Sequence, residues 1–108
     1  MATPEMSASL AALTEIDRLI HEPARLQIVA LLYVLDSADF VFVTQQTCLT
    51  WGNLSAHVTK LEEGGYIKVE KGFKGKRPQT MLSLTAKGKK AFQAYRLSMQ
   101  QMLNELPD

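Results

Sequence analysis

The sequence predicts a single, mainly helical α+β domain over residues 1–108. Three observations indicate this class: apolar residues recur at helical spacing in several segments, strand-like stretches occupy 66–71 and 79–84, and basic, glycine-containing residues separate these two stretches. At 108 residues the chain can build one domain with a modest core, which we place over residues 20–85. Its content of 46% hydrophobic and 21% charged residues argues against disorder.

The first predicted helix spans residues 7–20, with Ser7 as its cap. Its apolar residues repeat at helical spacing, namely Leu10, Leu13, Ile16 and then Leu19 or Ile20. Residues 1–6 are expected to fray. The apolar stripe is broad for an N-terminal helix, so it must pack either on its own domain or in a dimer interface, and the sequence leaves both open.

A second helix is predicted over residues 23–35. Pro23 fits its first turn, where the missing N–H of proline costs little. This helix is apolar nearly all round, so we expect it at the centre of the core. A short connection over 36–39 follows, in which Ser37 or Asp39 can cap the next helix.

Residues 40–47 admit two interpretations. Residues 40–43 have the composition of a strand, yet no turn signal separates them from the polar residues that follow. We predict a short helix over 39–47 with Phe40 and Val43 directed inward, and keep a strand over 40–43 as the alternative. The three residues 48–50 then form a turn.

Residues 50–63 are predicted to form a helix that Thr50 caps and the glycine pair 64–65 ends. One face is an apolar stripe of Leu54, Val58 and Leu61. The opposite face is small and polar, carries a single charge from Lys60, and has no carboxylate at its leading end. Solvated helix faces are usually richer in Glu and Lys, whereas a face of this kind suits a DNA groove.

Residues 66–71 and 79–84 are predicted to pair as a β-hairpin around a basic turn over 72–78. Thr85 can cap a last helix over 86–105. Its apolar residues follow a heptad-like spacing, namely Phe92, Tyr95, Met99, Met102 and Leu106. A helix of about 30 Å projects beyond a domain of this size, so its outer half needs a partner surface, most simply a second copy of the chain.

Charge is distributed unevenly along the chain. Residues 1–59 carry two basic and six acidic residues, whereas residues 60–96 carry ten basic and three acidic residues. Such asymmetry suggests a basic face directed at an anion, most often a nucleic acid. No apolar run approaches the ~20 residues of a membrane span, and no secretory leader is visible, so no membrane association is expected.

Other function classes lack their sequence signals. The single cysteine, Cys48, fits a reducing cytosol, so we expect a cytoplasmic protein. Cys48, His21 and His57 lie apart without metal-ligand spacing, so no metal or other cofactor is expected. The chain contains no phosphate loop and no nucleophile motif, and we therefore expect no enzyme activity.

The predicted order of helix, helix, short helix, capped helix, basic hairpin and long helix is that of a winged helix-turn-helix. Four segments carry a more specific resemblance. Residues 21–28 (HEPARLQI) resemble the opening of the second helix in ArsR-like regulators, and residues 50–67 resemble their recognition helix and its exit. Residues 71–78 resemble a wing, and residues 84–88 (LTAKG) are similar to the strand-to-helix junction of MarR-like proteins.

The chain thus resembles the small, single-domain MarR/ArsR-like regulators of transcription over about residues 20–95. The resemblance implies a homodimer with a two-stranded β wing and long N- and C-terminal dimerisation helices over 7–20 and 86–105. It also implies binding to double-stranded DNA, as an inverted repeat, with residues 50–63 in the major groove and the wing, residues 71–78, on the backbone or minor groove. Cys48 departs from the glycine that relatives often carry in the turn.

Candidate contact residues follow from this assignment. The DNA-contacting candidates are Thr50, Gly52, Asn53, Ser55, Ala56, His57, Thr59, Lys60, Lys71, Lys74, Lys76 and Arg77. The dimer-interface candidates are Leu10, Leu13, Ile16, Phe92, Tyr95, Met99, Met102 and Leu106. Asn53 can pair with adenine or bond a phosphate. Trp51 is expected to pack over the turn rather than against a DNA strand, and His57, at the edge of the apolar stripe, is either a contact residue or part of the core.

Two alternatives remain open at this stage. The chain could be a winged-helix protein-interaction module that binds an acidic partner without sequence-specific DNA binding. A small-molecule effector could also bind in a dimer cleft between the terminal helices, although nothing in the sequence identifies one.

Overall fold

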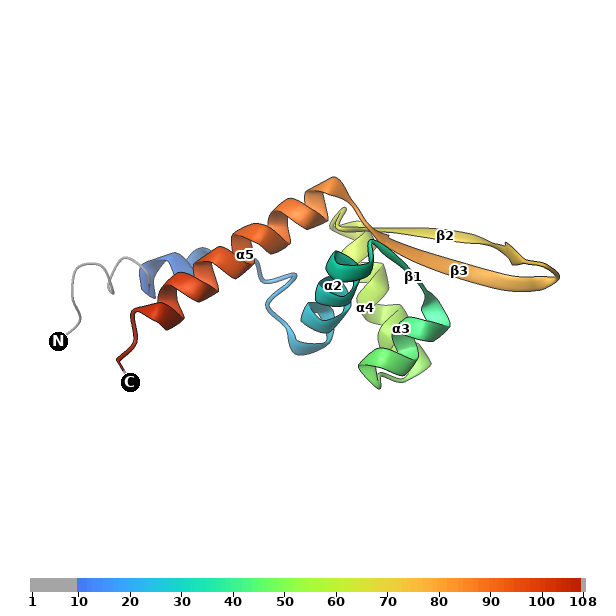
Figure 1. Ribbon diagram of the computed structural model, residues 1–108, viewed down its shortest axis with the longest axis horizontal. Helices are drawn as coiled ribbons and strands as arrows, with labels where there is room; N and C mark the ends of the chain where they lie inside the picture. The colour runs from blue at the N-terminus through green and yellow to red at the C-terminus, as the bar shows by residue number, and fades with distance from the viewer. Residues whose placement is uncertain (1–9, 108) are drawn as a thin grey trace.

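The computed structural model describes residues 10–107. The elements are η1 (Leu13–Glu15), α2 (Pro23–Leu35), β1 (Ser37–Asp39), α3 (Phe40–Thr47), α4 (Trp51–Glu63), β2 (Ile67–Lys74), β3 (Arg77–Leu84) and α5 (Ala86–Asn104). Helices α2, α3 and α4 gather at the middle of the molecule, while the β2–β3 hairpin extends from one end and α5 from the other, within a length of 62 Å (Figure 1). The predicted mainly helical α+β order is confirmed. None of the helices in this described part is long and apolar enough to cross a membrane.

The predicted helix over 7–20 is wrong in its second half, and its residues 7–9 lie outside the described part of the chain. Leu13–Glu15 form a 3₁₀ turn, and Ile16 is extended, with φ −60° and ψ 146°. The cause is Asp17, whose Oδ1 accepts hydrogen bonds from the backbone N–H of Leu19 at 2.9 Å and of Ile20 at 3.2 Å. Such a side-chain bond competes with helix formation. The resulting turn places Ile20 in the core with no exposed surface.

Helix α2 begins as predicted at Pro23, where the Glu22 carboxylate accepts the N–H of Arg25 at 2.8 Å. The helix contacts α3, α4, α5 and β3, which confirms its central position. Not all of its apolar residues are buried in the core, however. Ile28, Val29 and Leu32 are fully buried, whereas Val34 remains 77% exposed.

Residues 40–47 form a helix, as predicted, and the alternative strand over 40–43 is excluded. Asp39 caps this helix, since its side chain accepts the N–H of Val41 at 2.6 Å. Phe40 and Val43 face inward and are buried. The Asp39 cap and the burial of one helical face outweigh the strand propensity of this stretch.

The sheet has three strands in the order β1-β3-β2: the predicted two-stranded wing is confirmed as the β2–β3 hairpin, and a third strand that was not predicted is added at its base. The added strand, Ser37–Asp39, pairs antiparallel with β3, with Ala38 opposite Leu82. Three residues are too few to show alternation, which is why the sequence did not reveal this strand.

The hairpin turn is also tighter than predicted. Strand β2 continues to Lys74 and strand β3 begins at Arg77. These two residues pair with each other, so only Gly75 and Lys76 remain in the turn. Gly75 has a positive φ of 65°. Glycine at the first position of a two-residue loop matches a type II′ hairpin turn. Gly72, which suggested a loop, lies inside β2 opposite Gln79.

Helix α5 begins at the predicted cap, Thr85, whose Oγ1 accepts the N–H of Gly88 at 3.0 Å and donates to the carbonyl of Gly65 at 2.6 Å. Gly88 is buried where a Cβ would collide with the carbonyl oxygen of Tyr66. The start of α5 is therefore held against the residues that follow α4, while its outer half projects from the body (Figure 1).

Candidate nucleic-acid interface

Helix α4 has the predicted division between a buried and an exposed face. Thr50 Oγ1 accepts the N–H of Asn53 at 3.1 Å and starts the helix. The apolar stripe is buried, with Leu54 and Leu61 completely inaccessible and Val58 5% exposed. The exposed residues of the other face are Gly52, Asn53, Ser55, Ala56, Thr59 and Lys60. The first carboxylates of the helix come only in its last turn.

Trp51 stands at the leading end of this helix. Its ring packs against Phe40 of α3, with ring centroids 4.4 Å apart at an angle of 52°. The packing favoured by the sequence is therefore present, although Trp51 keeps 60% of its surface exposed. This contact ties the first turn of α4 to α3.

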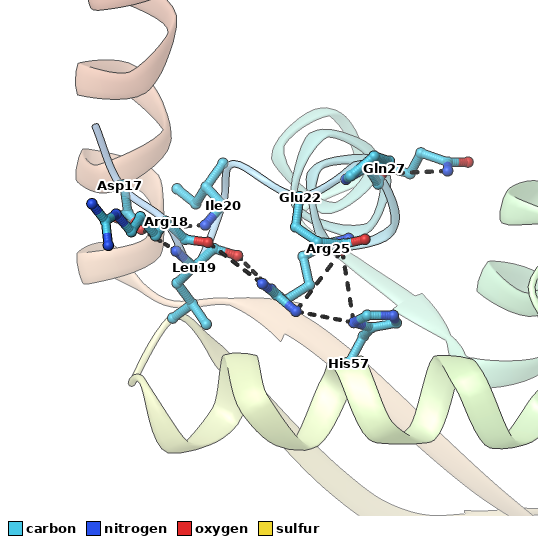
Figure 2. Close-up of polar contacts among 9 residues, drawn as sticks. Asp17, Arg18, Leu19, Ile20, Glu22, Arg25, Gln27 and His57 are labelled. Atoms are coloured by element: carbon cyan, nitrogen blue, oxygen red, sulfur yellow. Dashed lines mark hydrogen bonds and ion pairs between the residues drawn. The ribbon is translucent and has the colours of Figure 1, made fainter. Parts of the chain in front are cut away.

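His57 does not lie with the exposed residues of α4. Figure 2 shows its ring turned toward the start of α2, where His57 Nδ1 is 3.2 Å from Arg25 Nη1 and 3.7 Å from Glu22 Oε2. Its side chain is only 22% exposed. We therefore leave His57 out of the DNA contacts proposed below.

Arg25 is a structural residue that sequence reasoning missed. Its Nε donates to the carbonyl of Leu19 at 2.6 Å, and its Nη2 reaches the carbonyl of Arg18 at 3.4 Å (Figure 2). Through Nη1 it also meets His57, so one guanidinium joins the segment before α2 to the middle of α4. The sequence shows only that an arginine follows Pro23 by two residues, and this position does not identify the groups that Arg25 contacts.

Glu22 completes this cluster at the start of α2. Burial alone would raise the pKa of its carboxyl, but hydrogen bonds from the backbone N–H groups of Arg25 and Ala24, together with nearby positive charge, bring the pKa below its usual value. The carboxylate therefore remains charged beside Arg25, at 3.9 Å from Nη1.

The wing, residues 71–78, is exposed along its whole length. Its basic residues are Lys71, Lys74, Lys76 and Arg77, and none of them forms an ion pair with another residue in 10–107. The wing contains no acidic residue. In the described part of the chain the positive charge of the wing therefore has no direct ion-pair partner.

A cleft of about 300 Å³ separates α4 from the base of the wing. Ser55, Thr59 and Glu62 line it from α4, and Lys71 and Thr80 line it from the hairpin. Polar residues of the α4 face and a cation of the wing thus share one surface groove. An anionic strand could accept hydrogen bonds there from Ser55 and Lys71, whereas Glu62 disfavours it at the last turn of α4.

The turn before α4 contains Cys48 in the left-handed region, with φ 57°. Glycine adopts this conformation at least cost, which agrees with the glycine that the resemblance led us to expect in this turn. Among residues 10–107, no group of three or more His, Cys, Asp or Glu side chains is placed to hold a metal ion.

The predicted interface residues of the terminal segments divide into two groups. Phe92 and Tyr95 are buried in the chain's own core, where Phe92 packs on Tyr33 and Tyr95 bonds to His21 at 3.0 Å. The others keep exposed surface to differing degrees: Leu13, Ile16, Met99 and Met102 are half-buried, and Leu10 and Leu106 are exposed. Two further leucines of α5, Leu97 and Leu103, are 56% and 55% exposed and were not predicted.

Comparison with known proteins agrees with this architecture. Residues 24–103 match the family described as winged helix DNA-binding domain. An uncharacterized protein of Methanocaldococcus jannaschii is 36% identical over 78 residues, which cover 72% of this chain and 85% of that protein.

Solved structures share the fold. A transcriptional regulator homologue from Pyrococcus horikoshii superposes with a TM-score of 0.80 at 24% identity, covering 94% of this chain and 96% of that one. A MarR-family regulator from Silicibacter pomeroyi gives 0.62 at 20% identity, covering 94% and 66%. NadR in complex with 4-hydroxyphenylacetate gives 0.65 at 22% identity, covering 92% and 72%. The chain therefore belongs to the winged helix DNA-binding domain family, and its fold is that of MarR-type transcriptional regulators.

Proposed function

We propose that this chain is a homodimeric transcriptional regulator that binds double-stranded DNA. The observation that carries the proposal is the groove between α4 and the wing, where a polar helix face that has no carboxylate until Glu62 in its last turn lies opposite Lys71 of the wing. In this arrangement α4 lies in the major groove, and the wing contacts the backbone or the minor groove.

The exposed residues of α4 divide into plausible roles by their chemistry. Asn53, in the first turn, can pair bidentately with adenine, and Lys60 can bond guanine or a phosphate. Ser55 donates to a base edge or phosphate at the mouth of the cleft. The hydroxyl of Thr59 is already bonded to the carbonyl of Ser55 at 2.9 Å, so Thr59 contributes mainly its methyl group and shape. Gly52 and Ala56 allow the helix backbone to approach closely.

The exposed apolar residues of the terminal segments support the homodimer. Leu97 and Leu103 lie on the projecting half of α5 and Leu106 just beyond its end, and burying their exposed surface against a second copy is favourable. Two copies related by a twofold axis present two α4 helices, which suits an inverted repeat. Light scattering coupled to size exclusion tests this, and a 12 kDa species at micromolar concentration contradicts it.

Fluorescence anisotropy on genomic duplex fragments at two salt concentrations tests DNA binding. We expect binding that weakens steeply with salt, and weaker binding by Asn53→Ala and Arg77→Ala. Arg96→Ala is the charge-matched control for the second variant, since Arg96 lies over the Tyr33 ring of α2, away from α4 and the wing. Equal affinities of all three variants and the parent contradict the site assignment.

The alternative function, a protein-interaction module with an acidic partner, predicts little duplex binding even at low salt. The same titration separates the two functions. The charge on the wing suits either DNA or an acidic protein. An acidic protein that binds the wing alone, however, does not explain why the exposed polar face of α4 lacks carboxylates in its first turns. That face favours DNA.

A cleft of about 270 Å³ between η1 and α5 is a candidate site for a small-molecule effector. NadR has been solved with 4-hydroxyphenylacetate. In this chain Glu15 and Asp17 line the cleft beside Tyr66 and Tyr95. Two carboxylates disfavour an anionic ligand, so we expect neutral or cationic aromatic compounds to raise the melting temperature in a screen in which 4-hydroxyphenylacetate has no effect.

A further inference from the structure

We propose that Phe73 is an apolar wedge with which the wing enters the DNA minor groove and unstacks a base step. The inference rests on the DNA-binding function proposed above. It goes further by assigning a specificity-determining contact that no charged residue of the wing can make, and by predicting that the DNA is deformed.

Phe73 is the large aromatic side chain of the wing, and 74% of its surface is exposed. Its cross-strand partner is Pro78, which is also exposed. The two form an apolar pair in a hairpin segment that has no core beneath it. Exposed hydrophobic residues are common individually, so the pair alone identifies no partner.

The direction of the pair gives the first indication of its partner. Side chains alternate along a strand, so Phe73 is in register with Val69 and Lys71, which line the cleft facing α4, and it also lines a hollow on the other face of the hairpin beside Gln79 and Met81. Pro78 lines a neighbouring hollow beside Phe40 and Trp51 on the same side. Pro78 therefore faces the side on which α4 presents its polar residues, and Phe73 lies opposite it at the exposed margin of the hairpin.

The distance of Phe73 along the strand gives the second indication of its partner. Phe73 lies four residues beyond the half-buried Val69, which corresponds to about 13 Å of extended chain. The hairpin visibly extends well past the helices (Figure 1). When α4 occupies a major groove, a side chain at this distance can reach the adjacent minor groove.

Charge and shape select nucleic acid as the occupant. Cations flank the ring on both strands, and the wing has no carboxylate to repel phosphates. A Cβ added at Gly72 or Gly75 would meet nothing within 4 Å, so the backbone on either side of Phe73 is unobstructed. A slim ribbon with an apolar tip and basic margins fits a narrow groove lined by phosphates. Inserted apolar residues of this kind partly unstack a step and bend the duplex.

The proposal predicts a sequence preference outside the major-groove site. Pyrimidine–purine steps such as TA and CA unstack easily, whereas A-tracts are stiff. Bound DNA should therefore favour a flexible step where the wing lies, although no hydrogen bond reads it there.

The test uses a duplex selected by the parent protein from a random-sequence pool, with 2-aminopurine at the step under the wing. We expect 2-aminopurine fluorescence to rise on binding of the parent protein and of Phe73→Leu, but not of Phe73→Ala. Affinity should fall about tenfold for Phe73→Ala, with an unchanged salt dependence because no cation is lost. Lys76→Ala is the matched control: it should keep the fluorescence rise and lower the salt slope by about one.

The outcomes separate the two proposals. If the parent protein binds no duplex, the DNA-binding function fails and the wedge with it. If the parent binds while Phe73→Ala gives the same affinity and the same 2-aminopurine signal, the wedge alone is wrong. If Phe73→Ala binds DNA normally but loses binding to anionic vesicles or to a protein, Phe73 serves that partner and the wedge is again overturned. Phe73 is exposed, so an unchanged melting temperature of the variant is the folding control.

Discussion

Replacing Arg25 by alanine should destabilise the fold through one polar cluster. The Arg25 side chain is only 13% exposed and has three polar partners outside its own helix: the carbonyls of Leu19 and Arg18, and the His57 ring. The bond to Leu19 at 2.6 Å is the strongest of these, whereas that to Arg18 at 3.4 Å is near the limit of a hydrogen bond.

The magnitude follows from these contacts. A hydrogen bond with a charged donor contributes about 1.5–3 kcal/mol, and loss of the aliphatic stem of arginine adds packing energy. We expect Arg25→Ala to lower the free energy of unfolding by about 2–3 kcal/mol. Arg25→Lys keeps the charge but cannot reach several partners with one planar group, so it should fall between alanine and the parent.

Urea denaturation followed by the fluorescence of Trp51, the single tryptophan, measures this change at the helix that Arg25 holds. Arg18→Ala is the matched control, because Arg18 offers the cluster its backbone carbonyl, which alanine retains. An Arg25→Ala variant within 0.5 kcal/mol of the parent, by the order-of-magnitude scale for surface substitutions, would refute the reasoning.

Three further outcomes follow from particular contacts. Burial and the hydrogen bond to Asp17 raise the pKa of Tyr66 to about 12, and the unfolded phenol titrates near 10. The raised pKa therefore stabilises the fold fully below about pH 10, and this stabilisation is lost as the pH rises toward 12. Tyr66→Phe should be about 1 kcal/mol less stable than the parent at pH 8. Its urea midpoint should vary less than that of the parent between pH 10 and pH 12. Gly88→Ala should destabilise by about 2 kcal/mol despite better helix propensity, because its Cβ would meet backbone and Leu84 Cδ1, which is 2.8 Å away. Gly52→Ala, with nothing within 4 Å of its Cβ, should instead raise stability by about 0.5 kcal/mol in thermal unfolding while weakening DNA binding in anisotropy.

Features set by neighbouring residues could be predicted from the sequence. Thr50 and Thr85 were recognised as caps because the groups they bond lie three residues ahead. The stripe of α4 was recognised because helical spacing alone places Leu54, Val58 and Leu61 on one face. The polar face of α4 and the basic wing followed from composition within single segments.

Features that depend on residues distant in the sequence could not be predicted from it. The Asp17 carboxylate also accepts a hydrogen bond from the hydroxyl of Tyr66, 49 residues away, and no local pattern identifies that partner. The contact that turns His57 away from the exposed face of α4 depends on Arg25, 32 residues earlier. Heptad spacing placed Phe92 on an apolar seam that we assigned to the dimer interface, but spacing does not say whether the surface that the seam meets belongs to the same chain or to another.

These distant contacts also determine how the proposed DNA-reading helix is held. At its end, the residues after α4 are bound to α5, since Thr85 donates its hydroxyl to the Gly65 carbonyl at 2.6 Å and its N–H to the Tyr66 carbonyl at 3.0 Å. At its middle, His57 meets Arg25, which bonds the segment before α2. In the proposed homodimer, α4 is therefore joined through short polar contacts to the two segments that face the partner. The spacing of the two α4 helices, about 34 Å for adjacent major grooves, would then depend on these contacts rather than on α4 itself. Loosening them should relax the preferred distance between half-sites more than it weakens binding to one half-site.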